Sequence, residues 1–125
     1  MTNSDDQVAI DFEAAHFGHG TRCMPLADAR RLLEYCKARQ CAFQTTEAFE
    51  VFDGREILTL EYSILGLSDV ERSASSAADL HEIGRRSLDK AAAQPNPYIF
   101  KIWVDTIDNI LFAPLHRRRM DKSDL

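Results

Sequence analysis

A two-residue turn, Asp53-Gly54, limits more than any other feature what this chain can fold into. Both residues favour positive φ angles, and in FEVFDGREIL they stand between two runs of β-forming residues. With these two as the loop, Phe52 pairs with Arg55 and the other pairs follow outward. Apolar and polar residues alternate along this register, which predicts an antiparallel hairpin with one buried face. The face predicted to be buried carries Phe49, Val51, Leu58, Leu60, Tyr62 and Ile64.

One acidic residue, Glu47, falls on the face that this register buries. A carboxylate in a core has a raised pKa and can act as a general acid or base. A β-bulge over residues 45–47 removes the conflict, because it turns Glu47 to solvent and keeps Phe43 inside. We favour the bulge, or an end of the strand at this point, and Glu47 remains a candidate acid or base.

Helices and a further strand are predicted on both sides of the hairpin. Residues 25 to about 40 indicate a helix, because proline suits its first position and apolar residues follow at spacings of three and four. A turn or short helix after the hairpin leads to a main helix over about 76–93, where Ser76 has capping-box spacing. Residues 98–105 then predict a strand, and residues 106–115 a short helix.

The segment 7–16 is compatible with two structures. Apolar residues at every second position from Val8 to Ala14 are typical of a half-buried strand. The capping-box spacing of Ser4 and Gln7 is typical of a helix start instead. We favour the strand.

The fold class expected from these elements is α+β, in one domain over residues 1–125 with mobile tails at 1–6 and 116–125. With a first strand, the order is βαββαβ, which is typical of a ferredoxin-like fold: an antiparallel sheet with two main helices on one face. The short C-terminal helix is then an addition. With a first helix, the chain forms a three-stranded sheet under several helices, which is still α+β. At 125 residues, 45% of them hydrophobic, the chain suffices for one core.

The charge balance argues against two classes of partner. With 15 basic and 20 acidic side chains the net charge is −5, so we expect no binding to nucleic acid or to anionic membranes. Three cysteines and a polar N-terminus without a signal peptide predict a cytoplasmic protein. The longest apolar stretch, YIFKIWV, is far shorter than the roughly 20 residues of a membrane span.

The stretch HFGHGTRC concentrates side chains that bind metals. His16, His19 and Cys23 are all of zinc-ligand type, and the intervening glycines let the backbone curl so that the three can converge. A fourth ligand would come from Cys36 or Cys41. Cys23 also precedes a predicted helix, and the N-terminus of a helix lowers the pKa of a nearby thiol. Cys23 is therefore also a candidate nucleophile. Because the spacing matches no standard zinc site, we favour a plain loop and keep zinc as the alternative.

An aromatic patch is predicted where the sheet is not covered by helices. The residues assigned to it are Phe52 and Ile57 from the hairpin and Tyr98 and Trp103 from the last strand. Such a patch among charges is typical of a partner interface or a dimer face. The alternative is that the segment 107–115 folds back over it.

Two functions are compatible with these patterns. The first is a small acidic non-enzymatic interaction protein, of the regulatory, immunity or inhibitor type, which binds a protein partner or a second copy of itself. We favour it because the sequence has no phosphate loop, no paired catalytic carboxylates and no strong metal motif. The alternative is a small enzyme or a metal- or ligand-binding domain that uses His16, His19, Cys23 and Glu47.

Overall fold

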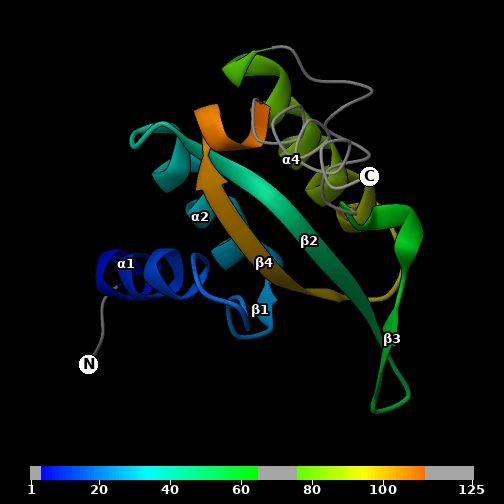
Figure 1. The fold of residues 1–125 in the computed structure, drawn as a ribbon. Helices are drawn as coiled ribbons and strands as arrows, with labels where there is room; N and C mark the ends of the chain where they lie inside the picture. Colours follow the sequence, from blue (N-terminus) through cyan, green and yellow to red (C-terminus); the bar gives the residue numbers. More distant parts are fainter. Residues whose placement is uncertain (1–3, 65–75, 112–125) are drawn as a thin grey trace, which may run out of the picture.

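The structure is a computed structural model, and it describes residues 4–64 and 76–111 (Figure 1). These residues form an α+β fold around one four-stranded antiparallel sheet, with the strand order β1-β4-β2-β3. The elements are α1 (Ser4–Ala14), β1 (Met24–Pro25), α2 (Leu26–Lys37), β2 (Cys41–Phe52), β3 (Arg55–Leu58), the 3-10 helix η1 (Leu60–Tyr62), α4 (Ala77–Ala92) and β4 (Tyr98–Thr106).

The predicted hairpin and its register are confirmed. Phe52 pairs with Arg55, and Phe49 pairs with Leu58. Asp53 and Gly54 have φ angles of 51° and 72°, the two positive values that a type I′ turn needs.

β2 does contain a bulge, but it precedes the residues 45–47 for which it was predicted, so Glu47 keeps the same face as Phe49 and Val51. The register of β2 against β4 shifts by one residue between Phe43 and Thr45. Each side chain after the shift therefore points to the face of the sheet opposite to the one that unbroken alternation would give it. Phe43 is buried in the core, whereas Glu47 is partly exposed and stands across from Lys101 of β4. The bulge therefore takes the Glu47 carboxylate out of the core.

The exchange reverses the two faces that the sequence predicts for the hairpin. Beyond the bulge, β2 turns Thr46 and Ala48 to the core, and both are fully buried. Phe49 and its partner Leu58 were predicted to be buried, but they lie on the opposite face. Phe49 is partly exposed there, and Leu58 is exposed. The predicted pairing was right and the predicted buried face was wrong, because one extra residue in a strand inverts every side chain after it.

Helices α2 and α4 pack together on one face of the sheet, behind β2 and β4 in Figure 1. Both helices were predicted, and the Ser76 side chain accepts a hydrogen bond from the Asp79 backbone N–H at the start of α4. Gly84 allows the close approach, because a Cβ there would lie 3.2 Å from Leu33 Cδ1 and 3.3 Å from a Phe43 ring carbon. The core between these layers includes Met24, Leu32, Leu88, Phe100 and Ile102, all fully buried.

The N-terminal segment is a helix, so the favoured prediction of a strand over residues 7–16 was wrong. Val8, Asp11 and Ala15 are buried, a spacing of three and four that only a helix brings to one side. Ile10, which the strand would have buried together with Val8, is exposed. The alternation was misleading because the buried face of α1 includes an acidic residue, Asp11, that the pattern counted as solvent-facing.

Two other predictions concern the ends of the chain. Residues 4–6, part of the predicted tail 1–6, belong to α1, and the tail 116–125 lies outside the described residues. Residues 107–111 are helical, as predicted for the C-terminal helix, and the rest of that helix lies outside the described range. Ile110 packs against Ala42 and Leu80 at one end of the sheet. Within the described residues, no helix has the length and apolar character of a membrane span.

The order from β1 onward is strand, helix, strand, strand, helix, strand, but its first strand is the residue pair Met24–Pro25 and not the segment 7–16. The strand order leaves β2 and β4 at the centre of the sheet and β1 and β3 at its edges. The α+β class is therefore established, whereas the ferredoxin-like arrangement stays a prediction.

Candidate interaction face

The zinc-ligand types in HFGHGTRC do not come together. His16, His19 and Cys23 are all exposed, and the described residues include no group of three or more His, Cys, Asp or Glu side chains that could hold a metal ion. The His16 ring instead meets the Phe12 ring edge to face, with 4.7 Å between the ring centroids.

The two cysteines considered as a fourth ligand are buried. Burial raises the pKa of the Cys36 thiol to about 12, and the neighbouring Cys41 adds to the rise. Burial also raises the pKa of Cys41. Both thiols are therefore protonated at neutral pH, and a protonated thiol is a weak nucleophile and a weak metal ligand.

The stretch serves instead to join α1 to the sheet. The Thr21 backbone N–H donates to the Ile102 carbonyl at 3.0 Å, and the Ile102 N–H donates to Thr21 Oγ1 at 2.9 Å. Further along β4, the Val104 N–H donates to the Ala15 carbonyl at 3.0 Å. These bonds satisfy backbone groups of β4 on the side where β1 is too short to reach them.

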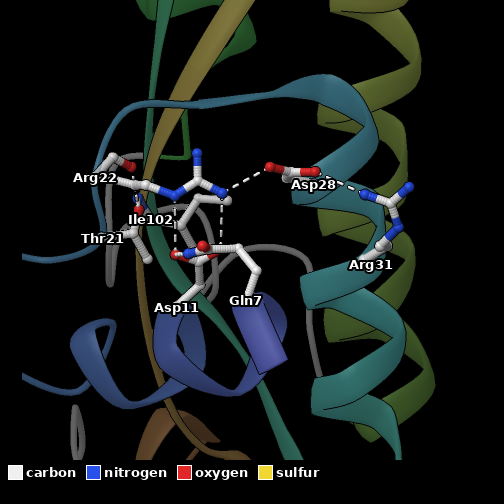
Figure 2. Close-up of polar contacts among 7 residues, drawn as sticks. All are labelled: Gln7, Asp11, Thr21, Arg22, Asp28, Arg31 and Ile102. Carbon is white, nitrogen blue, oxygen red and sulfur yellow. Dashed lines mark hydrogen bonds and ion pairs between the residues drawn. The ribbon is translucent and has the colours of Figure 1, made fainter. Parts of the chain in front are cut away.

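Arg22, near the end of this stretch, links α1 to α2, as Figure 2 shows. Its Nε and Nη2 donate to the two carboxylate oxygens of Asp11 on α1, both at 3.1 Å, and Nη2 donates to Asp28 on α2 at 2.6 Å. These hydrogen bonds raise the pKa of Arg22, and the bond to Asp11 contributes most to the rise. Gln7 also donates to Asp11, and Arg31 donates to Asp28. The Asp11 residue is only 3% exposed, so Arg22 supplies the charge that the buried carboxylate needs.

Trp103 is positioned by the same stretch. Its Nε1–H donates to the Gly18 carbonyl at 3.2 Å, and Gly20 packs directly against its ring. The Lys101 ammonium lies over the same ring, 5.7 Å from its centroid and within cation–π range. Trp103 is therefore held in one orientation while part of its surface stays accessible.

The face of the sheet turned away from α2 and α4, here called the outer face, is the candidate site. None of the helices in the described part of the chain covers its middle, which faces the viewer in Figure 1. At its centre Glu47 of β2 stands across from Lys101 of β4. The outer face consists of Thr45, Glu47, Phe49 and Val51 of β2, Ile99, Lys101 and Trp103 of β4, and Glu56 and Leu58 of β3. Leu58 is 45% exposed, Glu56 near the hairpin turn is also exposed, and the others are partly exposed.

The four residues predicted as a partner patch are not on one face. Trp103 lies on the outer face. Tyr98 faces the helices, is 8% exposed, and meets the Tyr62 ring edge to face. Ile57 and Phe52 project to the same side as Tyr98, on the part of the hairpin that extends beyond the helices. The predicted patch was wrong in this respect, because the bulge exchanged the faces of the hairpin.

A separate cavity of about 620 Å³ lies between the start of α2 and the end of α4. Tyr98 and Phe100 form part of its wall, and its lining is mainly apolar. None of the residues predicted for an enzyme or a metal site contributes to it. The other lining residues are Pro25, Leu26, Ala27, Ala91, Ala92, Gln94, Pro95, Asn96 and Pro97.

Comparisons with protein-family models, with curated proteins and with solved structures gave no match for this chain.

Proposed function

We propose that this chain is a non-enzymatic interaction protein, of the regulatory or inhibitor type, that binds a protein through the outer face. The observation that carries the proposal is a sheet face whose middle no helix of residues 4–64 and 76–111 covers. On it Phe49, Leu58, Ile99 and Trp103 surround the central pair of Glu47 and Lys101. Aromatic and aliphatic side chains with few charges at the centre are typical of protein interfaces.

The fixed orientation of Trp103 supports this function. An interface gains most from large side chains that lose little conformational entropy on binding, and tryptophan is enriched among such residues. The Trp103 ring is already held by Gly18, Gly20 and Lys101 in the free chain. Its contact surface is therefore preorganised.

We further propose a cytoplasmic location and a variant of the ferredoxin-like arrangement. The three free cysteines support the first, because unpaired thiols are typical of reducing compartments. The element order from β1 onward supports the second.

Two neighbouring hairpin residues give a matched test. Leu58 is 45% exposed on the outer face, and Ile57 is 46% exposed on the opposite face. We expect Leu58→Glu to weaken partner binding at least about tenfold, because a contact that buries a leucine contributes 1.4 kcal/mol or more. We expect Ile57→Glu to bind as the wild type does. The measurements are sedimentation of the purified protein and affinity capture with identification of the captured protein.

Circular dichroism and thermal unfolding should show that both variants fold, since each substitution changes an exposed side chain. Equal binding by the two variants, or no partner of any kind for the wild type, would overturn the proposal.

The cavity favours a second function, the binding of a small apolar molecule. Its volume of about 620 Å³ lies within the range of small-molecule sites, and apolar walls with few polar groups are typical of them. The polar groups at its rim are Gln94 and Asn96, the second of which donates to Glu50. The candidate enzyme residues His16, His19, Cys23 and Glu47 take no part in this site.

Anilinonaphthalene sulfonate, a fluorescent probe for apolar sites, tests this second function. We expect the probe to bind saturably and Ala92→Trp to weaken its binding about tenfold, because the indole would occupy part of the cavity. Ala93→Trp is the matched control, since Ala93 is also exposed but does not line the cavity. Equal loss in both variants, or a loss only in Leu58→Glu, would place the probe elsewhere and contradict the prediction.

A further inference from the structure

The two charged residues at the centre of the outer face form a pattern that is complementary to itself, and Glu56 lies away from them, beside the hairpin turn. β2 and β4 are neighbours at the centre of the sheet, and Glu47 and Lys101 are direct cross-strand partners. On one side of this pair Phe49 stands across from Ile99, and on the other side Thr45 stands across from Trp103. The acid thus lies on one strand and the base on the other, at the same level along the sheet.

A two-fold axis parallel to these strands, placed midway between them and above the face, exchanges β2 with β4. Each residue then lies over its own cross-strand partner in the second copy. Glu47 meets Lys101 at both symmetry-related positions, and Phe49 meets Ile99. Each charge at the centre therefore faces its opposite, Phe49 faces Ile99, and the Trp103 ring faces Thr45, whose hydroxyl carries no charge. This arrangement is self-complementary, as an isologous interface requires.

The other in-plane axis, perpendicular to the strands at the level of this pair, gives the contrary result. It places Glu47 over Glu47 and Lys101 over Lys101, and like charges brought together in this way cost several kcal/mol. The charges therefore select one orientation. In it the strands of the two sheets run within about 30° of each other, which is a normal angle for stacked sheets.

We infer that the partner of the outer face is a second copy of this chain, packed face to face about the axis parallel to β2 and β4, with Glu47 of each copy over Lys101 of the other. This inference rests on the proposed function, because it names the partner of that face. The apolar residues around the pair exclude water, and the two ion pairs fix the register of one copy on the other.

The area of the outer face sets the expected affinity of the dimer. The nine residues of β4 span about 30 Å at ~3.4 Å per residue, and four strands give a width of roughly 15 Å. Two such faces bury on the order of 1,000 Å² in total, the lower limit for a specific interface. We therefore expect a reversible dimer with a dissociation constant in the micromolar range.

Charge exchange between two variants tests this arrangement. We expect the wild type to sediment as a dimer over a concentration series, and Glu47→Lys and Lys101→Glu each to dissociate at least about tenfold more readily. We expect an equimolar mixture of the two variants to recover the wild-type dimer, because Lys101 of the first variant then faces Glu47 of the second across the axis, and the two new residues face each other. The double variant, with both substitutions in one chain, should also dimerise.

The mixture separates contacts between chains from contacts within a chain. Each single variant places like charges side by side on its own sheet, and that intrachain repulsion persists in the mixture. Lys101→Glu also removes the cation from the Trp103 ring. Recovery on mixing can therefore come only from pairing across the interface. Thermal unfolding of each variant gives the intrachain cost separately.

Three outcomes overturn the inference. If the wild type dimerises and Glu47→Lys and Lys101→Glu each dimerise with the same dissociation constant, the dimer uses another surface. A wild-type monomer that binds a different protein, in a manner lost in Leu58→Glu and kept in Ile57→Glu, excludes the second copy and leaves the proposed function standing. A wild-type monomer without any partner overturns both.

Discussion

Replacement of Arg22 by alanine is expected to lower the free energy of unfolding by about 3 kcal/mol, because it leaves the Asp11 carboxylate buried without its charged partner. In the variant Gln7 would remain as one neutral donor to this carboxylate. Loss of one member of a buried ion pair costs about 3–5 kcal/mol. We expect the lower end of that range, since the Arg22 side chain is itself 41% exposed and water screens it.

Urea unfolding measures this cost, and Arg31→Ala is the matched control. Arg31 donates to Asp28 one turn earlier on α2, and both side chains are accessible to water. Loss of the Arg31 side chain should therefore cost at most about 1 kcal/mol. Arg22→Lys should lie between the two variants, because an ammonium keeps the charge but cannot bind both Asp11 oxygens as a planar fork. Equal costs for Arg22→Ala and Arg31→Ala would contradict the assignment of Arg22 as the residue that holds α1 in place.

Replacement of Gly20 by alanine is expected to cost a similar amount, about 3 kcal/mol, for a steric reason. Gly20 has a φ of 70°, a conformation that costs an alanine roughly 1 kcal/mol. Its Cβ would also lie 2.6 Å from Trp103 Cε2, well inside van der Waals contact. The ring cannot move freely, since its N–H is bonded to the Gly18 carbonyl, and forced overpacking adds about 1–3 kcal/mol.

The Trp103 side chain reports this change directly, because it is the sole tryptophan of the chain. We expect Gly20→Ala to lower the urea midpoint and to shift the fluorescence emission to longer wavelength as the ring moves into water. Gly18→Ala is the control: a Cβ there meets nothing within 4 Å, so the midpoint should stay within the equivalent of about 0.5 kcal/mol. An unchanged emission maximum in Gly20→Ala would contradict the packing described for the ring.

Local patterns predicted local structure well. The Asp53-Gly54 turn and the Ser76 cap depend on residues within a few positions of one another, and both are confirmed. A bulge was predictable because a glutamate falls on the apolar face, but its position was misplaced: it precedes Thr45 and leaves Glu47 on the same face as Phe49. Its larger consequence was missed: the whole hairpin beyond the bulge presents its other face to the helices, so Phe49 and Leu58 lie outside.

The remaining errors come from contacts between distant residues. The buried position of Asp11 depends on Arg22, 11 residues later, and without that pair a helix with a carboxylate on its buried side does not look amphipathic. The spacing of Asp11 between Val8 and Ala15, at helical intervals, was the available signal. The outer face was not identified because its members come from strands that pair only in the folded chain, and residue types alone drew attention to the exposed histidines instead.

The two edge strands have a consequence for how sheets of this kind avoid fibrous aggregation. An edge strand with unpaired backbone groups is a template for adding further strands, and growth from edges produces ribbons and amyloid-like fibres. Here one edge is the residue pair Met24–Pro25, in which the proline has no N–H, and the other is the four-residue β3 with Arg55 and Glu56. Both edges are poor templates for growth. Growth of filaments from the edges of this sheet is therefore disfavoured.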